Sequence, residues 1–313
     1  MSTPWRDAWY EALYGPGGLY RREQPHEHFS TATSPGLVDV LAAAVVSLCR
    51  RDGLGSFVDV AGGGGELASA VCALAPDLEV TCLEVRERPV GLPQSVRWVR
   101  SPGGAALPDE LRSLSGALVL AHEWLDNVPC VVAERVDGAL LEVCVGPDGA
   151  ESLGSPVGPA DRAWVERWWP GGARVEIGRA RDEAWAALLA RIDDGLAVAV
   201  DYGHRLEARP ADGSLTAYRA GQVVVPVPDG SCDLTAHVAV DSLSHDRTVR
   251  QRALLEELGL TLATPDPTLA REAPAAYLRA LARHSAVTAM RDPGGLGGFW
   301  WVLARRGAPG AAD

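Results

Sequence analysis

The stretch of sequence that decides the fold is Phe57-Val58-Asp59-Val60-Ala61-Gly62-Gly63-Gly64-Gly65-Glu66-Leu67, a short apolar run that leads into four glycines. A second apolar run, Leu78 to Leu83, ends at Glu84, about 20 residues after the glycines. A strand, a glycine turn, a helix and a second strand that ends in an acid form the mononucleotide-binding unit that makes up half of a dinucleotide-binding fold. Glycine lets the backbone approach a ligand closely, and the acid can accept hydrogen bonds from two ribose hydroxyls. The sequence therefore predicts a site for a nucleoside cofactor.

Two classes of cofactor compete for this turn. The pattern Gly63-x-Gly65-x-x-Ala68 matches the dinucleotide fingerprint, which places a pyrophosphate on the helix N-terminus. Asp59 lies inside the first strand, however, and Glu66 opens the helix where a diphosphate would bind. Acids at both places favour a cationic cofactor without phosphates, and S-adenosylmethionine carries an ammonium, a sulfonium and a ribose. We therefore favour S-adenosylmethionine over NAD, with a glycine turn that binds no ligand as the third alternative.

Composition and charge exclude several classes of function. The net charge of −12 argues against a general nucleic-acid surface. No apolar run is long enough to span a bilayer, and the N-terminus lacks a signal-peptide pattern. The six cysteines form neither a C-x-x-C pair nor a zinc spacing, so we predict free thiols in a reducing cytoplasm and no metal site.

The alternation of apolar segments predicts an α/β fold, a doubly wound Rossmann-like sheet with insertions after its fourth and fifth strands. Strands are expected over 57–61, 79–84, 96–99, 116–121, 196–200 and 299–304, with a hairpin over 130–146 and a linker over 147–160. Helices are expected over 5–14, 35–51, 66–74, 164–169, 182–192 and 249–258. We treat residues 1–313 as a single domain with an N-terminal helical or lid segment (1–52), a cofactor-binding half (53–129), a first insertion (130–181) and a second half (182–313) with an irregular insertion at 204–232.

Further segments resemble a known family. Leu13-Tyr14-Gly15-Pro16-Gly17-Gly18-Leu19-Tyr20 and His28-Phe29-Ser30-Thr31-Ala32 resemble the N-terminal signature of the MidA-type methyltransferases, which include the mitochondrial complex I assembly-factor methyltransferase. The block from His122 to Pro129 resembles that family's Asn-Glu-Phe-Phe-Asp-Ala-Leu-Pro, and Asp201-Tyr202-Gly203 its Asp-Tyr-Gly. Residues 213–219 and 233–238 resemble two later blocks, so the resemblance covers most of the chain in family order.

The resemblance implies a class I methyltransferase that depends on S-adenosylmethionine, and the best-known activity in the family is arginine N-methylation of proteins. Three departures concern the site. Ala61 and Gly62 stand where the family usually has Gly-Pro, and Asp59 stands for Glu. His122 replaces Asn beside the expected acceptor site. Expected cofactor residues are Asp59, Ala61, Gly62, Gly63, Gly65 and Glu84, with Thr31 in a lid over the methionine end of the cofactor.

Glu123 and Asp126 are the expected catalytic acids. Their i and i+3 spacing after the fourth strand places them on one side of a helical turn. Two carboxylates can grip a guanidinium by paired charge-assisted hydrogen bonds and assist its loss of a proton, because its pKa exceeds about 12. The alternative is a pair of acids that stabilises a helix start.

Other polar residues are expected to complete the site. Asp201 and Tyr202 end a buried strand, where an unpaired acid is costly, so we assign them with Asp233 to the substrate pocket, or Asp201 to a cap. His237 is a candidate general base or a structural histidine. His122 is a base, an acceptor contact or a packed substitute for Asn.

Three functions are consistent with these residues. The first is methylation of an arginine, or another nitrogen, of a protein partner by direct in-line displacement. The second is a small-molecule N- or O-methyltransferase of specialised metabolism, favoured by His122 and by the first insertion. Trp168 and Trp169 of that insertion either line an aromatic acceptor pocket or pack the insertion onto the sheet. The third is a cofactor-binding assembly factor with little turnover. An NAD oxidoreductase is a distant fourth.

Overall fold

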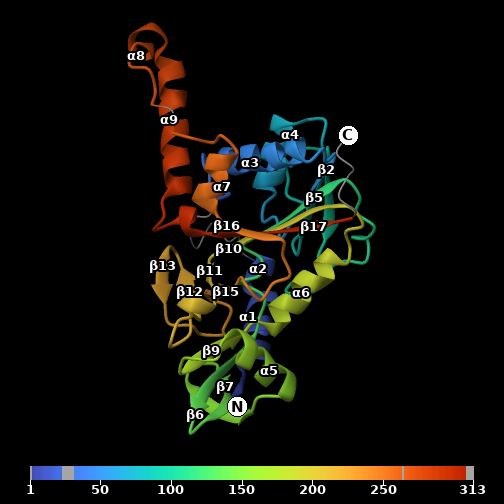
Figure 1. Ribbon diagram of the computed structural model, residues 1–313, viewed down its shortest axis with the longest axis vertical. Helices are drawn as coiled ribbons and strands as arrows, with labels where there is room; N and C mark the ends of the chain where they lie inside the picture. The colour runs from blue at the N-terminus through green and yellow to red at the C-terminus, as the bar shows by residue number, and fades with distance from the viewer. Residues whose placement is uncertain (1, 23–31, 263, 308–313) are drawn as a thin grey trace.

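A central sheet of seven strands organises the computed structural model, which describes residues 2–22, 32–262 and 264–307 (Figure 1). The strands are β2 (Ser56–Val60), β3 (Glu79–Glu84), β4 (Val96–Arg100), β5 (Ala117–His122), β10 (Gly195–Asp201), β16 (Arg247–Arg250) and β17 (Trp300–Arg306). Their order is β16-β17-β10-β5-β2-β3-β4, and β17 runs antiparallel to both of its neighbours. Every residue of β5 and β10 is buried, as expected for parallel strands covered on both faces.

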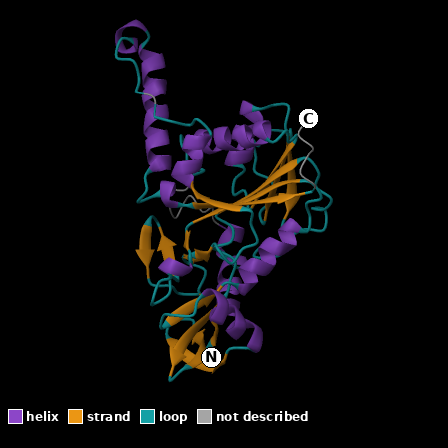
Figure 2. Ribbon diagram, in the orientation of Figure 1, coloured by secondary structure: helices purple, strands orange, loops and turns teal. Residues whose placement is uncertain are grey.

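Helices cover the two faces of this sheet (Figure 2). Because side chains alternate along a strand, Leu118 and Leu120 of β5 face one layer, and Val119 and Ala121 face the other. The first layer contains α3 (Val38–Arg51), α4 (Glu66–Leu74) and α7 (Gln251–Glu257), and the second contains α6 (Arg179–Leu189). The carboxyl ends of β2, β3, β4 and β5 therefore open between helical layers, at the edge where such sheets bind ligands.

The N-terminal segment joins the first insertion in a second sheet. This sheet has the order β1-β7-β6-β9, with β8 paired to β7. Its elements are β1 (Thr3–Pro4), β6 (Val131–Val136), β7 (Ala139–Val145), β8 (Glu151–Pro156), β9 (Arg174–Ile177) and the helix α5 (Pro159–Trp168). Helices α1 (Trp5–Tyr14) and α2 (Leu19–Arg22) follow β1, and Trp9 of α1 donates a hydrogen bond to the carbonyl of Leu234 at 3.0 Å. This packing holds the N-terminal helices against the later insertion.

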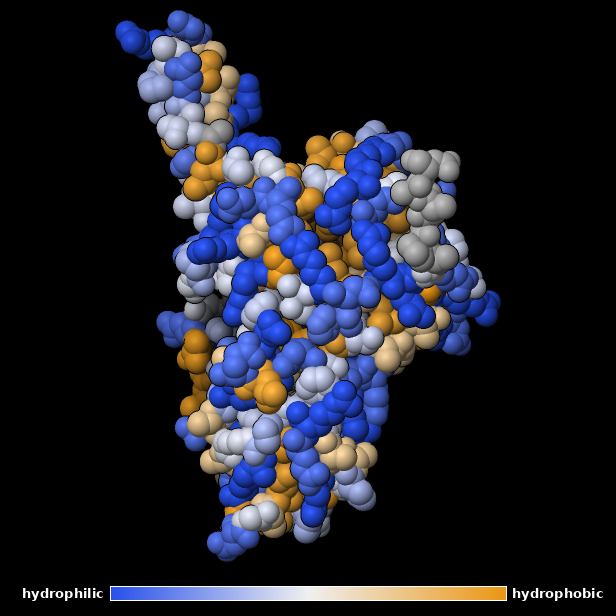
Figure 3. All heavy atoms as spheres, in the orientation of Figure 1, coloured by the Kyte–Doolittle hydropathy of each residue, from blue (hydrophilic) through white to orange (hydrophobic). Residues whose placement is uncertain are grey.

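The second insertion and an arm complete the chain. The insertion contains the short strands β11 (Gly203–His204), β12 (Thr216–Arg219), β13 (Gln222–Val224), β14 (Asp233–Thr235) and β15 (Val238–Ala239), and the 3-10 turn η2 (Leu206–Ala208). The arm consists of α8 (Leu269–Glu272) and α9 (Pro274–Arg291), followed by the 3-10 turn η3 (Leu296–Gly298). Ala286, Val287 and Met290 anchor the arm in the core, and its far end projects from the body (Figure 1). Hydrophilic and hydrophobic residues are mixed on the visible face of this projecting part (Figure 3).

The doubly wound sheet is confirmed, and several elements differ from the sequence expectation. The linker expected over 147–160 contains β8, because β7 supplies backbone partners to residues that are poor strand formers. The helix expected from 249 begins at Gln251, because the preceding residues pair with β17 as β16. The insertion at 204–232 was expected to be irregular and contains the paired strands β12 and β13. No helix was predicted where α9 lies.

Arg181 of α6 ties the fourth-strand turn to the second insertion. Its side chain is 1% exposed and donates to the carbonyls of Asp126 at 2.7 Å, His237 at 2.8 Å and Val128 at 3.2 Å. A buried guanidinium is tolerated when its donors are all directed at acceptors. Arg181 therefore fixes the relative positions of two segments that carry expected site residues.

Substitution of Arg181 by Met is expected to lower the free energy of unfolding by about 3 kcal/mol, because two buried carbonyls and one part-buried carbonyl lose their donor. Equilibrium urea unfolding measures this loss. Arg162→Met on the exposed side of α5 is the matched control, and its effect should stay within about 0.5 kcal/mol. Equal effects of the two variants would contradict the structural role of Arg181.

Candidate functional site

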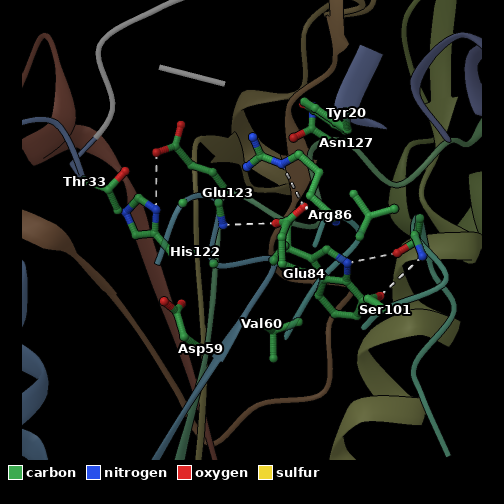
Figure 4. Close-up of a pocket in the computed structure, with 18 of the residues that line it drawn as sticks. Tyr20, Thr33, Asp59, Val60, Glu84, Arg86, Ser101, His122, Glu123 and Asn127 are labelled. Carbon is green, nitrogen blue, oxygen red and sulfur yellow. Dashed lines mark hydrogen bonds and ion pairs between the residues drawn. The ribbon is translucent and has the colours of Figure 1, made fainter. Parts of the chain in front are cut away.

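A pocket opens at the carboxyl ends of β2, β3, β4 and β5 (Figure 4). Residues from each of these strand ends line it, and Tyr14 and Tyr20 from the N-terminal helices form another part of its wall. The lining includes Asp59, Gly62, Gly63, Glu84, Ser101 and His122. The glycine turn and the acid that ends β3 thus lie in one cavity, as the sequence predicts for a nucleoside site.

The glycines of the turn are required by close contacts. A Cβ atom on Gly62 would lie 2.4 Å from Cys82 Sγ and 2.7 Å from Asp59 Oδ2, so a side chain has no room there. Gly63 has a φ of 60°, in the left-handed region that favours glycine. Its N–H donates to Glu84 Oε2 at 3.0 Å, which joins the turn to the end of β3. Gly65 is not in the pocket wall; its left-handed backbone instead begins α4.

The pocket gathers several acidic side chains. Asp59 is 2% exposed, and its Oδ2 atom has no hydrogen-bond partner among the described residues. Burial, and then the charges of Glu66 and Glu84, raises the pKa of Asp59 to about 8. Burial also raises the pKa of Glu84, against the opposing effect of Arg86, whose Nε lies 3.5 Å from the Glu84 carboxylate. A cationic ligand would reduce the electrostatic repulsion among these acids, and a pyrophosphate would increase it.

Glu123 and His122 lie where β5 ends. The His122 ring turns toward the Glu123 carboxylate, with Nδ1 and Oε1 3.3 Å apart (Figure 4). Burial raises the pKa of Glu123 well above its usual range and lowers the pKa of His122 to about 4, so this histidine is neutral near pH 7. Glu123 has a φ of 50°, which is strained for a side chain of this kind, and its N–H donates to the Val200 carbonyl at 2.9 Å.

A second pocket begins on the other side of Glu123. Glu123 lines both pockets. The rest of the second pocket is formed by the ends of β10, β12 and β16, by His237 and Arg252, and by residues 293–299. Tyr202, His237 and Phe299 bring aromatic rings to its wall, and the Tyr202 ring meets the other two edge-on at 5.3 and 5.5 Å. A group bound in this second pocket would therefore meet the first pocket at the Glu123 carboxylate.

Asp126 and Asp201 lie beneath this junction rather than in either wall. The Oδ2 atom of Asp126 accepts hydrogen bonds from the hydroxyls of Thr235, at 2.8 Å, and Tyr202. Asp201 accepts from the Leu125 N–H at 3.2 Å, and burial, then Asp126, raises its pKa. Asp126 thus orients Tyr202, and Asp201 holds the turn that presents Glu123.

Asp233 lies behind the cofactor pocket. It accepts hydrogen bonds from the Tyr20 hydroxyl at 2.6 Å and from the Asn127 side-chain amide at 3.4 Å. Burial raises the pKa of Asp233 to about 8, against the effect of the Tyr20 hydrogen bond. Because Tyr20 and Asn127 line the pocket, Asp233 supports its wall from outside.

The expected site residues therefore differ in their places relative to the two pockets. Asp59, Ala61, Gly62, Gly63, Glu84 and His122 line the first pocket, Tyr202 and His237 line the second, and Glu123 lines both. Asp126, Asp201, Asp233 and Gly65 support these walls, and Thr31 lies outside the described residues. Sequence reasoning missed Ser101, Arg86, Asn127 and the two tyrosines. Ser101 follows β4 directly, so the rule that ligands bind at carboxyl strand ends would have found it.

Two further observations concern metal ions and membranes. Over the described ranges, no three His, Cys, Asp or Glu side chains gather in a way that could hold a metal ion. None of the helices in the described part of the chain is both long and apolar enough to cross a membrane. Fold and site together define a nucleoside-binding α/β protein with an acidic, cation-selecting pocket.

Comparisons with known proteins agree with this class. A family model described as "Putative S-adenosyl-L-methionine-dependent methyltransferase" matches residues 83–262, and the chain belongs to this family. The crystal structure of a superfamily member and "likely methyl transferase" from Burkholderia thailandensis, bound to S-adenosyl-homocysteine, is similar to this chain. Its sequence is 21% identical and its TM-score is 0.77, and the match covers 100% of this chain and 90% of that one. A native structure of the same superfamily and organism is 23% identical with a TM-score of 0.76, covering 99% and 89%. No curated protein matches.

The protein is thus a methyltransferase with the Rossmann-like fold, and S-adenosylmethionine is its cofactor. The residues present fit that cofactor, because the unpaired Asp59 oxygen and the acids around it suit a cation. Glu84 would accept hydrogen bonds from the ribose, and Gly62 and Gly63 would let the cofactor approach the backbone closely. When bound, the cofactor supplies an activated methyl group on its sulfonium.

The raised pKa of Asp59 makes cofactor binding depend on pH. Asp59 must ionise to balance a cation, so with a pKa of about 8 in the free protein, binding releases a proton below pH 8 and affinity rises with pH up to that value. The ratio of Kd for Asp59→Asn to Kd for the wild type is expected to increase roughly tenfold from pH 6.5 to 8.

Isothermal titration with S-adenosylmethionine measures this ratio, which cancels the titration of the cofactor's own amino group. Asp109→Asn, an exposed acid outside the pocket, is the matched control and should give a ratio near one at every pH. A pH-independent ratio for Asp59→Asn would show that this carboxyl does not balance the cofactor's charge.

Proposed function

We propose that the chain transfers a methyl group to a guanidinium nitrogen of an arginine in a protein partner. The observation that carries the proposal is the position of Glu123, whose side chain lines both the cofactor pocket and the second pocket. The acceptor side chain enters by the second pocket and meets Glu123 at the junction. A methyl acceptor must reach the cofactor at such a junction to react in line.

The charge at the junction suits a guanidinium. Glu123 is buried with its Oε1 atom lacking a hydrogen-bond donor within the described chain, apart from the ion-pair distance to His122. A guanidinium can supply that donor and form charge-assisted hydrogen bonds. Its nitrogen lone pair is delocalised, and its proton leaves as the new N–C bond forms. A carboxylate with a raised pKa is well matched to accept that proton, so Glu123 acts as orienting group and base.

Asp126 and His122 assist without touching the acceptor nitrogen in this scheme. Asp126 fixes the Tyr202 ring in the wall of the second pocket. His122 is neutral and restrains the Glu123 carboxylate from the cofactor side. His237 contributes to the acceptor wall, and partial burial lowers its pKa, so it too is predominantly neutral near pH 7.

The resemblance to MidA-type methyltransferases supports the same acceptor. Their Glu and Asp correspond to Glu123 and Asp126 within the block from His122 to Pro129. The family's best-known activity is protein arginine N-methylation. His122, which replaces the family's Asn, lies next to Glu123 at the junction of the two pockets. A residue at this position could alter which acceptor is bound.

A small-molecule N- or O-methyltransferase is the second candidate. The specific observation in its favour is the aromatic wall of the second pocket, where Tyr202, Tyr218 and Phe299 could stack on a planar acceptor. Trp169, for which the sequence left open an acceptor wall or packing of the insertion, is buried in the first insertion against His204, at 4.6 Å between ring centroids.

Labelled methyl transfer into a cell lysate distinguishes these acceptors. With wild-type protein and methyl-labelled S-adenosylmethionine, label is expected in the protein fraction as methylarginine after acid hydrolysis. Glu123→Gln is expected to lower the rate by at least about 100-fold, because it removes the base, and to leave the Kd for the cofactor within about threefold. Glu166→Gln, an exposed acid of α5, is the control and should retain full activity.

Other distributions of label reject the proposal. Label confined to the small-molecule fraction favours the second candidate. Tight cofactor binding without label in either fraction favours a cofactor-binding assembly factor. Full activity of Glu123→Gln would refute the role given to this residue.

A further inference from the structure

The outer end of the second pocket carries positive charge. Arg250 and Arg252 line it, together with the glycine-rich loop of residues 293–299. The Arg250 guanidinium lies 3.7 Å from the centroid of the Trp300 ring and also donates a hydrogen bond to the Gly298 carbonyl. Stacking and hydrogen bonding together restrict the movement of this guanidinium, so its charge has a defined position.

This charge lacks a carboxylate partner. Neither Arg250 nor Arg252 forms an ion pair with an acid of residues 2–22, 32–262 or 264–307. A like charge acts on Arg250 as well, because Arg205, which lies 3.7 Å from the Glu207 carboxylate, is over the same Trp300 ring at 5.7 Å. Burial, and then Arg205, lowers the pKa of Arg250. An anion would relieve the repulsion between the two guanidiniums.

The central sheet sets the distance between the two charged ends of the pocket. Arg250 of β16 pairs with Trp300 of β17, and Trp300 pairs with Asp201 of β10. The next strand is β5, which ends in His122 beside Glu123. The backbone of Arg250 thus lies three strand spacings, about 14 Å, from the backbone of Glu123. An extended peptide covers this distance in about four residues.

We propose that the second pocket has an anion subsite at Arg250, assisted by Arg252, which binds a carboxylate or phosphate group of the acceptor. The pocket is bipolar: its inner end, at Glu123, takes the cation to be methylated, and its outer end takes an anion about four residues away along the chain. The inference rests on the proposed arginine acceptor and adds that the methylated segment carries an acidic or phosphorylated residue.

A factorial set of peptides tests the subsite by isothermal titration onto protein saturated with S-adenosyl-homocysteine. The probes are acetyl-Arg-Gly-Gly-Gly-Asp-amide and its reversed sequence, each with phosphoserine or asparagine in place of the acid, and each with norleucine in place of arginine. In one of the two sequence directions, the wild type is expected to bind the acidic and phosphorylated arginine peptides roughly tenfold more tightly than the asparagine peptide. The Arg250→Gln variant is expected to bind all three peptides with about equal affinity. Which anion gains more distinguishes carboxylate from phosphate recognition.

Two further variants separate recognition from a structural role. Arg247→Gln removes an exposed arginine from the same strand, outside the pocket, and should keep the tenfold preference. Arg250→Lys keeps the charge and should keep a reduced preference for acidic over asparagine peptides. If Arg250 had only a structural role, neither the wild type nor any variant would show this preference. Thermal unfolding of each variant checks that the loop of residues 293–299 remains folded with the rest of the protein.

The comparison of acidic with asparagine peptides and the comparison of arginine with norleucine peptides test different claims. Equal affinity of the wild type for acidic and asparagine peptides overturns the anion subsite, as does a preference that survives in Arg250→Gln. Equal affinity for arginine and norleucine peptides contradicts the proposed arginine acceptor but leaves the acid comparison intact. Absence of binding by every peptide rejects both.

Discussion

The burial of carboxylates that lack cationic partners is the constraint on which this structure depends. Asp59, Glu123 and Asp201 each have a buried oxygen without a hydrogen-bond donor in the described part of the chain. Such groups are costly in a protein interior unless a ligand supplies the missing charge. Arg181, the buried cation nearby, directs its donors at main-chain carbonyls. A cationic ligand would supply the missing charge as these carboxyls ionise, which suits the sulfonium cofactor and the cationic acceptor proposed above.

The central sheet determines where these buried acids lie relative to one another. Parallel strands bring their carboxyl ends to one edge, so acids that are distant in sequence meet in one region. The strained backbone of Glu123 then places its carboxyl between two pockets, with Asp201 holding the following turn. Strain of this kind persists when surrounding contacts fix the conformation, and here they include the bond from the Glu123 N–H to β10.

Features fixed by local pattern could be predicted from the sequence, and features that depend on distant pairing could not. The glycine turn, Glu84 and Glu123 follow apolar strands, so their places at strand ends were predictable. The supporting roles of Asp126 and Asp233 depend on Tyr202 and Tyr20, which lie 76 and 213 residues away in sequence. β8 and β16 form because β7 and β17 offer backbone partners, which their own composition does not indicate. Arg250 acquires its position through the Trp300 ring and the Gly298 carbonyl, which lie about 50 residues away in sequence.

The central claim is that Glu123 receives a guanidinium from the second pocket beside the cofactor. The distance between its carboxylate and the guanidinium, in a crystal structure with S-adenosyl-homocysteine and an arginine peptide, tests this claim most directly. The account predicts that a guanidinium nitrogen lies about 3 Å from a Glu123 oxygen and faces the cofactor sulfur. A peptide bound outside the second pocket, or a Glu123 carboxylate that contacts only His122, would contradict it.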